Sequence, residues 1–345
     1  MTNLSYARGS SEPPVPEGTI GDWLDRAAEQ FPDTEAHVAP WQDVRWTWAE
    51  LRERTDSLAR GLTGLGLALG DRVGIWAPNC VEWVLTQLAT ARLGLVLVSI
   101  NPAYRPHELG HALRLAEVRA LVTARSFKTS DYVGMLAELM PSSADDKEGP
   151  LFDPNLPELR YVIEIGGSTA AARIGFDSLL VEDGELTAPA LDPNQAINIQ
   201  FTSGTTGAPK GATLSHRNLL HNGASPTAGM RLGPEDRLCI PVPLYHCFGM
   251  VLGVLVCLTS GATIVFPGPA FDPALVLGTV ERERCTALHG VPTMFLAELD
   301  HPDFRSFDLS TLRTGIAAGA LCPAPMMRRM IDEMNLKEIT IAYGM

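Results

Sequence analysis

The order of strand-like and helix-like runs along the chain constrains its fold more than any other feature. Strands are predicted at residues 72–76, 95–100 and 119–123, and helices at residues 80–93 and 106–116, in strict alternation. The strand at residues 95–100 is almost entirely apolar, which is typical of a strand covered on both faces. Because strands that alternate with helices pair in parallel through right-handed crossovers, this order predicts an α/β fold with largely parallel sheets.

The same alternation resumes in the C-terminal half, beyond a Gly-rich stretch around residue 205. Upstream of both halves, Thr19 and Thr47 are each expected to begin a helix, with a hairpin at residues 37–46 between these helices. Since 345 residues exceed the size at which one core usually divides, we expect two or more subdomains. The C-terminal half is predicted to contain strands at residues 237–242, 262–266, 286–289, 312–317 and 338–342, and helices at residues 248–258, 273–284, 293–299 and 325–334.

Charge and cysteine content argue against several classes of protein. The chain carries 27 Lys and Arg against 40 Asp and Glu, a formal net charge of −13, which disfavours nucleic acid as a partner because phosphate backbones require a basic face. The most apolar run, residues 250–266, is interrupted by Gly253, Thr259, Ser260 and Gly261, so we expect no integral membrane segment. Six cysteines without a C-x-x-C pair, and an N-terminal arm (residues 1–18) without an apolar signal sequence, favour reduced thiols in the cytoplasm.

The Gly-rich stretch at residues 200–211 is the strongest candidate for a ligand site. A predicted strand leads into four hydroxyl residues and three glycines, and Lys210 closes the stretch. Glycines let backbone N–H groups approach an anion, hydroxyls add donors and the lysine adds a positive charge, so the pattern predicts a phosphate-binding loop. It is not a Walker loop, because Pro209 precedes the lysine and Gly211 follows it. The alternative is that the stretch is an ordinary surface turn. In either case we expect a helix at residues 215–222 after the stretch.

Other candidates follow from the rule that open α/β sheets bind ligands beyond the carboxyl ends of their strands. Glycines or aromatic residues lie at several predicted strand ends, as a shared cleft for a nucleotide and an organic substrate would require. These segments are residues 202–210, 243–249, 290–292, 318–321 and 343–345.

Each of these candidates also has a simpler structural interpretation. Tyr343 could stack on a purine or be a core tyrosine, and the turn at residues 319–320 could approach a base edge or serve only as a turn. His246 lies among Tyr245, Cys247 and Phe248, where a histidine is more often a packed residue or pocket wall than a base. The hydroxyl residues of the Gly-rich stretch have no Ser-His-Asp partners, and no residue pattern marks a metal site.

Residues 202–211 resemble the signature loop of the adenylate-forming (AMP-binding) superfamily, which includes acyl-CoA synthetases, adenylation domains of peptide synthetases, and luciferases. The resemblance covers nearly the whole chain. Tyr343, Gly344 and Met345 match the start of the family's Y-G-x-T-E motif, and residues 318–321 lie where the family has its adenine-contacting turn. Residues 101–109 and 243–249 are most similar to the fatty-acid-type (medium-chain) acyl-CoA synthetases.

The resemblance implies a fold and a reaction. It implies two stacked α/β subdomains in layered αβαβα order, within one AMP-binding N-terminal domain at residues 19–345. We place the subdomains approximately at residues 71–225 and at residues 19–70 together with 226–345. The implied reaction is a two-step ligation that uses ATP and Mg²⁺, passes through an acyl-adenylate and ends with transfer to coenzyme A, with a fatty acid as the carboxylic acid.

The resemblance also implies roles for individual residues. Thr202 and Lys210 are expected to act directly in adenylation, and His246, Phe248 and Gly249 to wall the acyl pocket. The magnesium ion is expected to come with ATP, held largely by phosphates, and no residue of this chain is assigned to a metal. The expected nucleotide-binding residues are Thr202, Ser203, Gly204, Thr205, Thr206, Gly207 and Lys210 for the β- and γ-phosphates, and Gly319, Ala320, Leu321, Tyr343, Gly344 and Met345 for the adenine end.

One departure from the family pattern limits the expected activity. The sequence ends at Met345, before the motif's threonine and magnesium-binding glutamate, and without the small C-terminal domain. We therefore expect weak nucleotide binding and poor turnover from this chain alone. Two alternatives stay open: an adenylation domain that loads a carrier protein, and a non-catalytic adenylate-binding fragment. The oligomeric state is also open.

Overall fold

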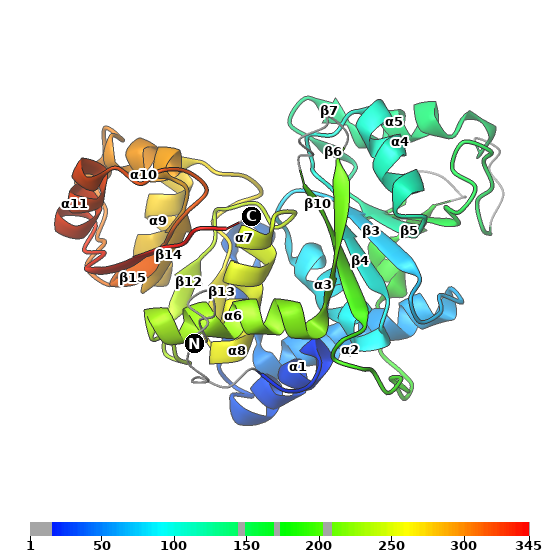
Figure 1. Ribbon diagram of the computed structural model, residues 1–345, viewed down its shortest axis with the longest axis horizontal. Helices are drawn as coiled ribbons and strands as arrows, with labels where there is room; N and C mark the ends of the chain where they lie inside the picture. Colours follow the sequence, from blue (N-terminus) through cyan, green and yellow to red (C-terminus); the bar gives the residue numbers. More distant parts are fainter. Residues whose placement is uncertain (1–15, 144–148, 169–172, 203–208, 345) are drawn as a thin grey trace, which may run out of the picture.

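The computed structural model describes residues 16–143, 149–168, 173–202 and 209–344, and it contains two seven-stranded sheets (Figure 1). In the first sheet all neighbouring strands pair in parallel except β1 and β2, which form the predicted hairpin. Its strands, in spatial order, are β16 (Glu338–Ile341), β15 (Thr314–Ala317), β14 (Ala287–Gly290), β12 (Arg237–Cys239), β13 (Thr263–Val265), β1 (Glu35–Ala39) and β2 (Val44–Thr47).

The second sheet is also parallel, apart from one antiparallel strand at its edge. Strand β11 pairs antiparallel with β10, and every other neighbouring pair is parallel. The predicted α/β fold with two largely parallel sheets is therefore confirmed. The strands in spatial order are β11 (Lys210–Ser215), β10 (Ala196–Thr202), β4 (Val96–Ser99), β3 (Arg72–Trp76), β5 (Val118–Thr123), β8 (Tyr161–Glu164) and β9 (Ile174–Gly175); β6 (Ser126–Phe127) and β7 (Ser130–Asp131) form a separate small hairpin.

The helices begin where the local sequence provides caps. The side chain of Thr19 accepts a hydrogen bond from the backbone N–H of Asp22, and Thr47 does the same for Glu50, so both predicted helix starts are confirmed. No helix among the described residues is both long enough and apolar enough to cross a membrane. The α-helices are α1 (Ile20–Gln30), α2 (Trp48–Gly64), α3 (Val81–Leu93), α4 (Pro106–Leu115), α5 (Tyr132–Leu139), α6 (His216–Met230), α7 (Cys247–Gly249), α8 (Val256–Ser260), α9 (Pro273–Glu283), α10 (Pro292–Leu299) and α11 (Ala324–Glu333); the short 3₁₀ helices are η1 (Pro40–Gln42), η2 (Pro141–Ser143), η3 (Phe176–Leu179) and η5 (Phe304–Ser306), and the π-helix is η4 (Met250–Leu255).

Of the three apolar clusters among the described residues, the largest joins the two sheets. Helix α3 is buried on nearly every face, and its side chains belong to the same cluster as Leu97 of β4 and Ile264 of β13. Trp48 of α2 is fully buried, and its indole N–H donates to the carbonyl of Gly261 at 3.1 Å. The sheets thus share one hydrophobic interior. The subdomain boundaries expected from the sequence stay a prediction.

Three local predictions were wrong or incomplete. Lys210 does not end a loop: it begins β11, which pairs along the whole of β10, and the helix that follows is α6, fifteen residues long. The helix predicted at residues 248–258 consists of α7, a π-helix and α8 in succession. The polar sequence of residues 142–158, with three prolines, predicts a surface loop, but Leu151 and Leu156 are buried, so the described part is anchored to the core. Helix α5 had not been predicted.

Ion pairs gather at the amino-terminal edge of the first sheet. Arg313 contacts Asp236 at 2.6 Å, and Arg237 contacts Glu35 at 2.5 Å and Glu283 at 3.2 Å. Except for Glu283, which ends α9, these residues lie at or just before the starts of their strands. The opposite, carboxyl edge of this sheet carries the Gly-rich and aromatic turns.

Candidate functional site

Four of the predicted segments meet at the carboxyl edge of the first sheet. Strands β12, β14, β15 and β16 are neighbours and run parallel, so the turns that follow them emerge at the same edge (Figure 1). Gly319 follows β15 with φ of 87°, a backbone conformation that favours glycine. A Cβ atom at Gly319 would lie 3.1 Å from the side chain of Val291, so the turns after β15 and β14 are in direct contact.

The expected adenine-contacting residues are exposed. Tyr343 is fully exposed and Leu321 is 87% exposed, and Gly319, Ala320 and Gly344 are exposed beside them. The alternative of a core tyrosine at residue 343 is therefore excluded. Met345 lies outside the described residues. An uncovered aromatic ring and an uncovered leucine beside a glycine turn leave room for a flat apolar ligand.

The Gly-rich stretch lies at the end of the β10–β11 hairpin. Thr202 is the last residue of β10 and pairs with Lys210, the first residue of β11. Thr202 is half-buried, and Lys210 is exposed without an ion-pair partner among the described residues. The intervening positions Ser203, Gly204, Thr205, Thr206 and Gly207 lie outside the described residues. The hairpin thus holds a hydroxyl and an ammonium group opposite each other at the carboxyl end of β10.

His246 caps a short helix. Its Nδ1 accepts a hydrogen bond from the backbone N–H of Phe248 at 3.1 Å, so this nitrogen is unprotonated and occupied. Partial burial lowers the pKa of His246, which favours the neutral ring. His246 is nevertheless exposed, so it is not a packed core residue, and its expected role as a pocket wall stays a prediction.

Phe248 and Gly249 follow His246 in the short helix α7. Phe248 is buried, and its ring centroid lies 5.4 Å from that of His289. A Cβ atom at Gly249 would collide with the backbone of Pro243 and Leu244, so the turn is closed too tightly for any side chain there. Gly249 therefore contributes backbone shape to the turn.

Asn79 links the carboxyl edges of the two sheets, and the sequence had given no sign of it. Asn79 follows β3 of the second sheet and is 4% exposed. Its Nδ2 donates to the carbonyl of Val242 and its Oδ1 accepts from the backbone N–H of Leu244, both at 2.9 Å. The segment after β12 in the first sheet is therefore held against the segment after β3 in the second.

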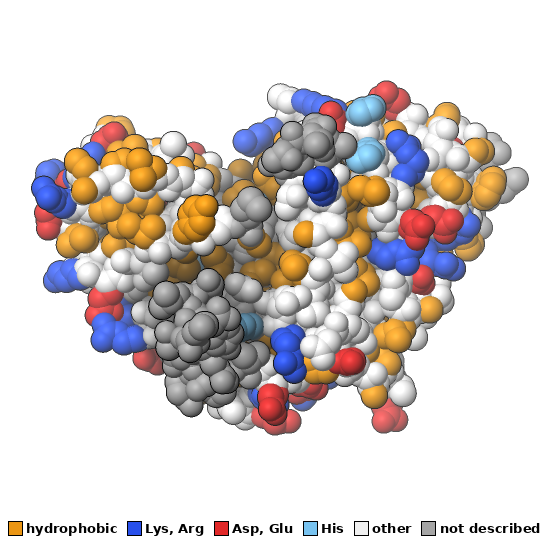
Figure 2. Space-filling view, viewed as in Figure 1, with side chains coloured by type: hydrophobic (Ala, Val, Ile, Leu, Met, Phe, Trp, Pro, Cys, Tyr) orange, Lys and Arg blue, Asp and Glu red, His pale blue; other side chains and the backbone are white. Residues whose placement is uncertain are grey.

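The two segments that resemble medium-chain enzymes also lie together. Burial raises the pKa of Tyr104, and a smaller electrostatic effect of Tyr245 adds to the shift, so these two tyrosines are near each other. In Figure 2 the surface is hollowed between the part formed by α9 to α11 and the part that carries β10 and α4, and hydrophobic side chains line the hollow. We take this hollow, which lies between parts of the chain that belong to the two sheets, as the candidate cleft.

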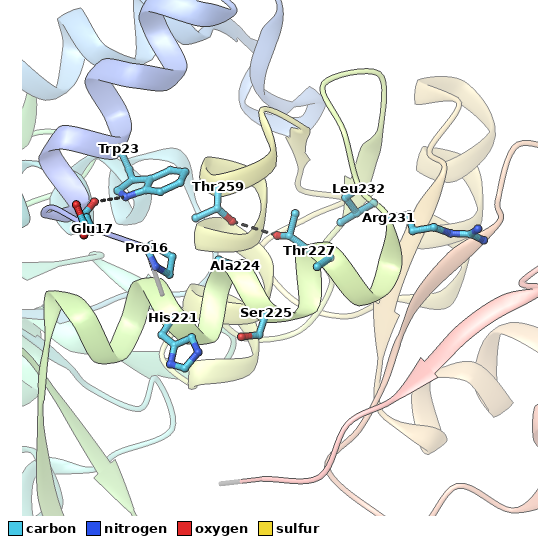
Figure 3. A pocket seen from close by; sticks show the side chains of 11 residues that line it. Pro16, Glu17, Trp23, His221, Ala224, Ser225, Thr227, Arg231, Leu232 and Thr259 are labelled. Carbon is cyan, nitrogen blue, oxygen red and sulfur yellow. Dashed lines mark hydrogen bonds between the residues drawn. The ribbon is translucent and has the colours of Figure 1, made fainter. Parts of the chain in front are cut away.

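Two further findings bear on the site. A cavity of about 620 Å³ lies along α6; Trp23, Thr227 and Thr259 line it, and the two threonine hydroxyls are 3.1 Å apart (Figure 3). None of the predicted site residues lines this cavity. Among the described residues, no group of three or more His, Cys, Asp or Glu side chains is placed to hold a metal ion.

Comparison with known proteins gives the family. The family model for AMP-binding enzymes matches residues 24–345. The chain is 45% identical over 333 residues to "Putative acyl-CoA synthetase YngI" of Bacillus subtilis (strain 168), covering 94% of this chain and 60% of that protein. It is 40% identical over 354 residues to the mitochondrial medium-chain acyl-CoA ligase ACSF2 of Homo sapiens, covering 99% of this chain and 57% of that protein. The chain therefore spans about three fifths of the length of these relatives.

Solved structures show the same fold. The inhibitor-bound N-terminal domain of FACL13 from Mycobacterium tuberculosis matches with a TM-score of 0.77 and 26% identity, over 95% of this chain and 76% of that one. The anthranilate CoA ligase AuaEII in complex with anthranoyl-AMP matches with a TM-score of 0.83 and 24% identity, over 97% of this chain and 62% of that one. At that identity, the second match shows the fold alone.

Proposed function

Because the chain belongs to the family of AMP-binding enzymes, we propose that it is part of an ATP-dependent carboxylate–CoA ligase that works through an acyl-adenylate. The observation that carries the proposal is the meeting of the two carboxyl edges at Asn79. Asn79 lies at the carboxyl edge of the second sheet, which contains β10 and β11. Through Asn79 this edge contacts the carboxyl edge of the first sheet, whose strand ends carry Gly319, Tyr343 and His246. One cleft region thus offers candidates for a phosphate, an adenine and an acyl chain.

The proposed first step is attack of a carboxylate oxygen on the α-phosphorus of ATP, which breaks the bond to pyrophosphate. Negative charge develops on the departing pyrophosphate, and Lys210 and the hydroxyl of Thr202, opposed at the end of the hairpin, are placed to stabilise it. Magnesium would arrive with the ATP phosphates and neutralise part of their charge. In the second step the sulfur of coenzyme A attacks the acyl carbonyl carbon, and AMP leaves.

We propose a medium-chain fatty acid as the carboxylic acid. The support is the nearness of Tyr245 to Tyr104 and the burial of Phe248, together with the name of the human relative. His246, Phe248 and Gly249 would form one wall of the acyl pocket. Gly319, Ala320, Leu321 and Tyr343, with Gly344, would hold the adenine.

The test is a panel of carboxylic acids of two to sixteen carbons, with ATP and Mg²⁺, against the protein at the full length of its relatives. AMP and thioester are measured in the presence of free coenzyme A. Thioester formation with a maximum at intermediate chain length supports the proposal. Adenylate that free coenzyme A does not consume would indicate transfer to a carrier protein, and absence of AMP with every acid would refute adenylation.

The 345-residue chain is assayed beside the full-length protein. We propose that this chain binds nucleotide but turns over slowly. We also propose that residues 71–225 form one subdomain and that residues 19–70 together with 226–345 form the other, in line with the strands that make up each sheet. We also propose that the protein works in the cytoplasm, where its six free cysteines would stay reduced. Cell fractionation tests the last point, and a mitochondrial location, as in the name of the human relative, would refute it.

A further inference from the structure

The π-helix η4 directly follows the turn at His246 and is held by side chains from both sheets. The carbonyl oxygen of Met250 accepts a hydrogen bond from Nε2 of Gln87 at 3.3 Å, and the carbonyl oxygen of Leu252 accepts one from Nε2 of His289 at 2.8 Å. Gln87 lies on α3, against the second sheet, whereas His289 lies on β14 of the first. π-Helical segments within helices are frequent at functional sites. We therefore ask whether the hydrogen bonds from Gln87 and His289 to this segment serve the candidate site.

The second sheet also contacts the π-helix through the strand that leads to the Gly-rich stretch. Nε2 of Gln200 donates to Sδ of Met250 at 2.8 Å and to Oγ of Ser99 at 3.0 Å. All three side chains are buried, with exposures of 8%, 0% and 1% for Gln200, Met250 and Ser99. Gln200 lies two residues before Thr202 on β10, so a shift of this strand end would be transmitted to the start of the π-helix.

The first sheet makes the corresponding contact from the other side. Nδ1 of His289 accepts from the backbone N–H of Ile316 at 3.1 Å, while its Nε2 donates to Leu252. The ring is therefore neutral, and burial lowers the pKa of His289 to about 4. Ile316 lies on β15, three residues before Gly319. A continuous series of buried contacts thus runs from β10 through the π-helix to β15.

Fold stability alone does not explain this network. Oε1 of Gln87 and Oδ1 of Asn198 are buried without a hydrogen-bond partner among the described residues. Asn198 belongs to the same network, because its Nδ2 lies 3.5 Å from Oγ of Ser99. Buried acceptors without donors destabilise a fold, and apolar side chains of similar shape would avoid that penalty.

We propose that Gln200 and His289 are positioning residues that, through the π-helix, hold the acyl turn in register with the phosphate-binding and adenine-binding strand ends. This inference rests on the proposed function, since it concerns the same cleft. Neither residue is expected to touch substrate. Their effect should be largest for a ligand that spans all three parts of the site, because only such a ligand requires the parts to be in register.

The test compares one spanning ligand with its two halves on the 345-residue chain. The probes are AMP, octanoate and the octanoyl sulfamate of adenosine, a non-hydrolysable mimic of the acyl-adenylate, each titrated by calorimetry. The linking factor is the product of the two half-ligand dissociation constants divided by that of the mimic. Gln200→Leu and Met250→Leu are expected to lower this factor about tenfold, with each half changed by less than about threefold.

A double-mutant cycle separates positioning from general damage. Met250→Leu removes the sulfur while roughly conserving volume, and the double variant should lose no more than either single variant because both remove the same contact. His289→Phe should lower the linking factor similarly, and His289→Gln, which keeps a donor for Leu252, should recover part of it. The matched control is Thr90→Val on α3, whose buried hydroxyl bonds only to carbonyls of its own helix.

The outcomes are distinguishable. A wild-type linking factor in stably folded Gln200→Leu and His289→Phe variants, or an equal loss in Thr90→Val, would overturn the inference alone. If the wild-type chain bound neither AMP nor the mimic, the proposed function would fail and the inference with it. Urea unfolding of every variant shows that each is folded at the titration temperature.

Discussion

A neutral histidine inside the first sheet should make the protein sensitive to acid. His37 on β1 is fully buried, and neither ring nitrogen has a hydrogen-bond partner among the described residues. Its ring lies edge-on to Phe266, with centroids 4.6 Å apart. Burial lowers the pKa of His37 from 6.5 to about 3. The unfolded chain therefore binds a proton at this residue at pH values where the folded chain does not.

The sign and size of the effect follow from proton linkage. Because the folded pKa is depressed, the stability attributable to the neutral ring is fully present above about pH 6.5 and is lost as the pH falls toward 3. Between pH 7 and pH 5 the loss from His37 alone is about 2 kcal/mol. Burial lowers the pKa values of His216 and His289 to about 4, so they add losses of similar size. The buried carboxyl of Glu298, whose pKa is raised well above its usual range by burial, acts in the opposite direction.

A variant that does not titrate isolates the contribution of His37. His37→Leu removes both unpartnered nitrogens, and we expect its free energy of unfolding in urea to exceed that of the wild type by about 2 kcal/mol more at pH 5 than at pH 7. His301→Leu is the control, because His301 has intermediate exposure at the surface. A difference between wild type and His37→Leu that stays constant from pH 7 to pH 5 would refute the reasoning.

Three further predictions concern the site and the ion pairs. Lys210→Met should slow adenylation by the full-length protein about 10²-fold and change the free energy of unfolding by less than about 0.5 kcal/mol, since the side chain is exposed; an unchanged rate in a pyrophosphate-release assay would remove the lysine from its role. Arg313→Leu should destabilise the chain by about 3 kcal/mol in urea because it leaves Asp236 buried without its cation, and adding Asp236→Asn should restore part of this loss; no restoration would contradict the explanation. Asn79→Ala should cost about 2 kcal/mol of stability by removing the bonds to Val242 and Leu244, and should weaken binding of the acyl-adenylate mimic more than that of AMP; equal weakening of both would argue against a link between the edges.

The parts of the fold that depend on local chemistry were predictable from the sequence. The capping threonines fixed the starts of α1 and α2, and the apolar runs located nearly every strand of both sheets. Strand β11 was missed because its residues are small or polar and mostly exposed, and only pairing with β10 makes them a strand. The π-helix was missed because its side chains have ordinary helical spacing, whereas its hydrogen bonding depends on Gln87 and His289 from elsewhere in the chain.

The candidate site divides in the same way. Glycines, hydroxyls and aromatic residues that would contact a ligand are visible in sequence because turns at strand ends require them, as the positive φ of Gly319 illustrates. The residues that join the turns are not visible. Asn79 contacts a segment more than 160 residues away, and Gln200 contacts Ser99 across 101 residues. Such contacts depend on which strands become neighbours in the folded sheets, and no local sequence pattern encodes that arrangement.

The two edges of the first sheet show how the fold accommodates a site of this kind. At the amino-terminal edge, charged side chains at strand starts form ion pairs, as Arg237 does with Glu35 and with Glu283 at the end of α9. At the carboxyl edge, exposed Tyr343 and Leu321 contribute little to the core. Substitutions at the carboxyl edge should therefore change ligand binding with little change in stability. Substitutions at the amino-terminal edge should change stability with little change in ligand binding. Gly249 is an exception among the carboxyl-edge residues. Because the backbone of Pro243 leaves no room for a side chain there, Gly249→Ala should lower both ligand binding and stability.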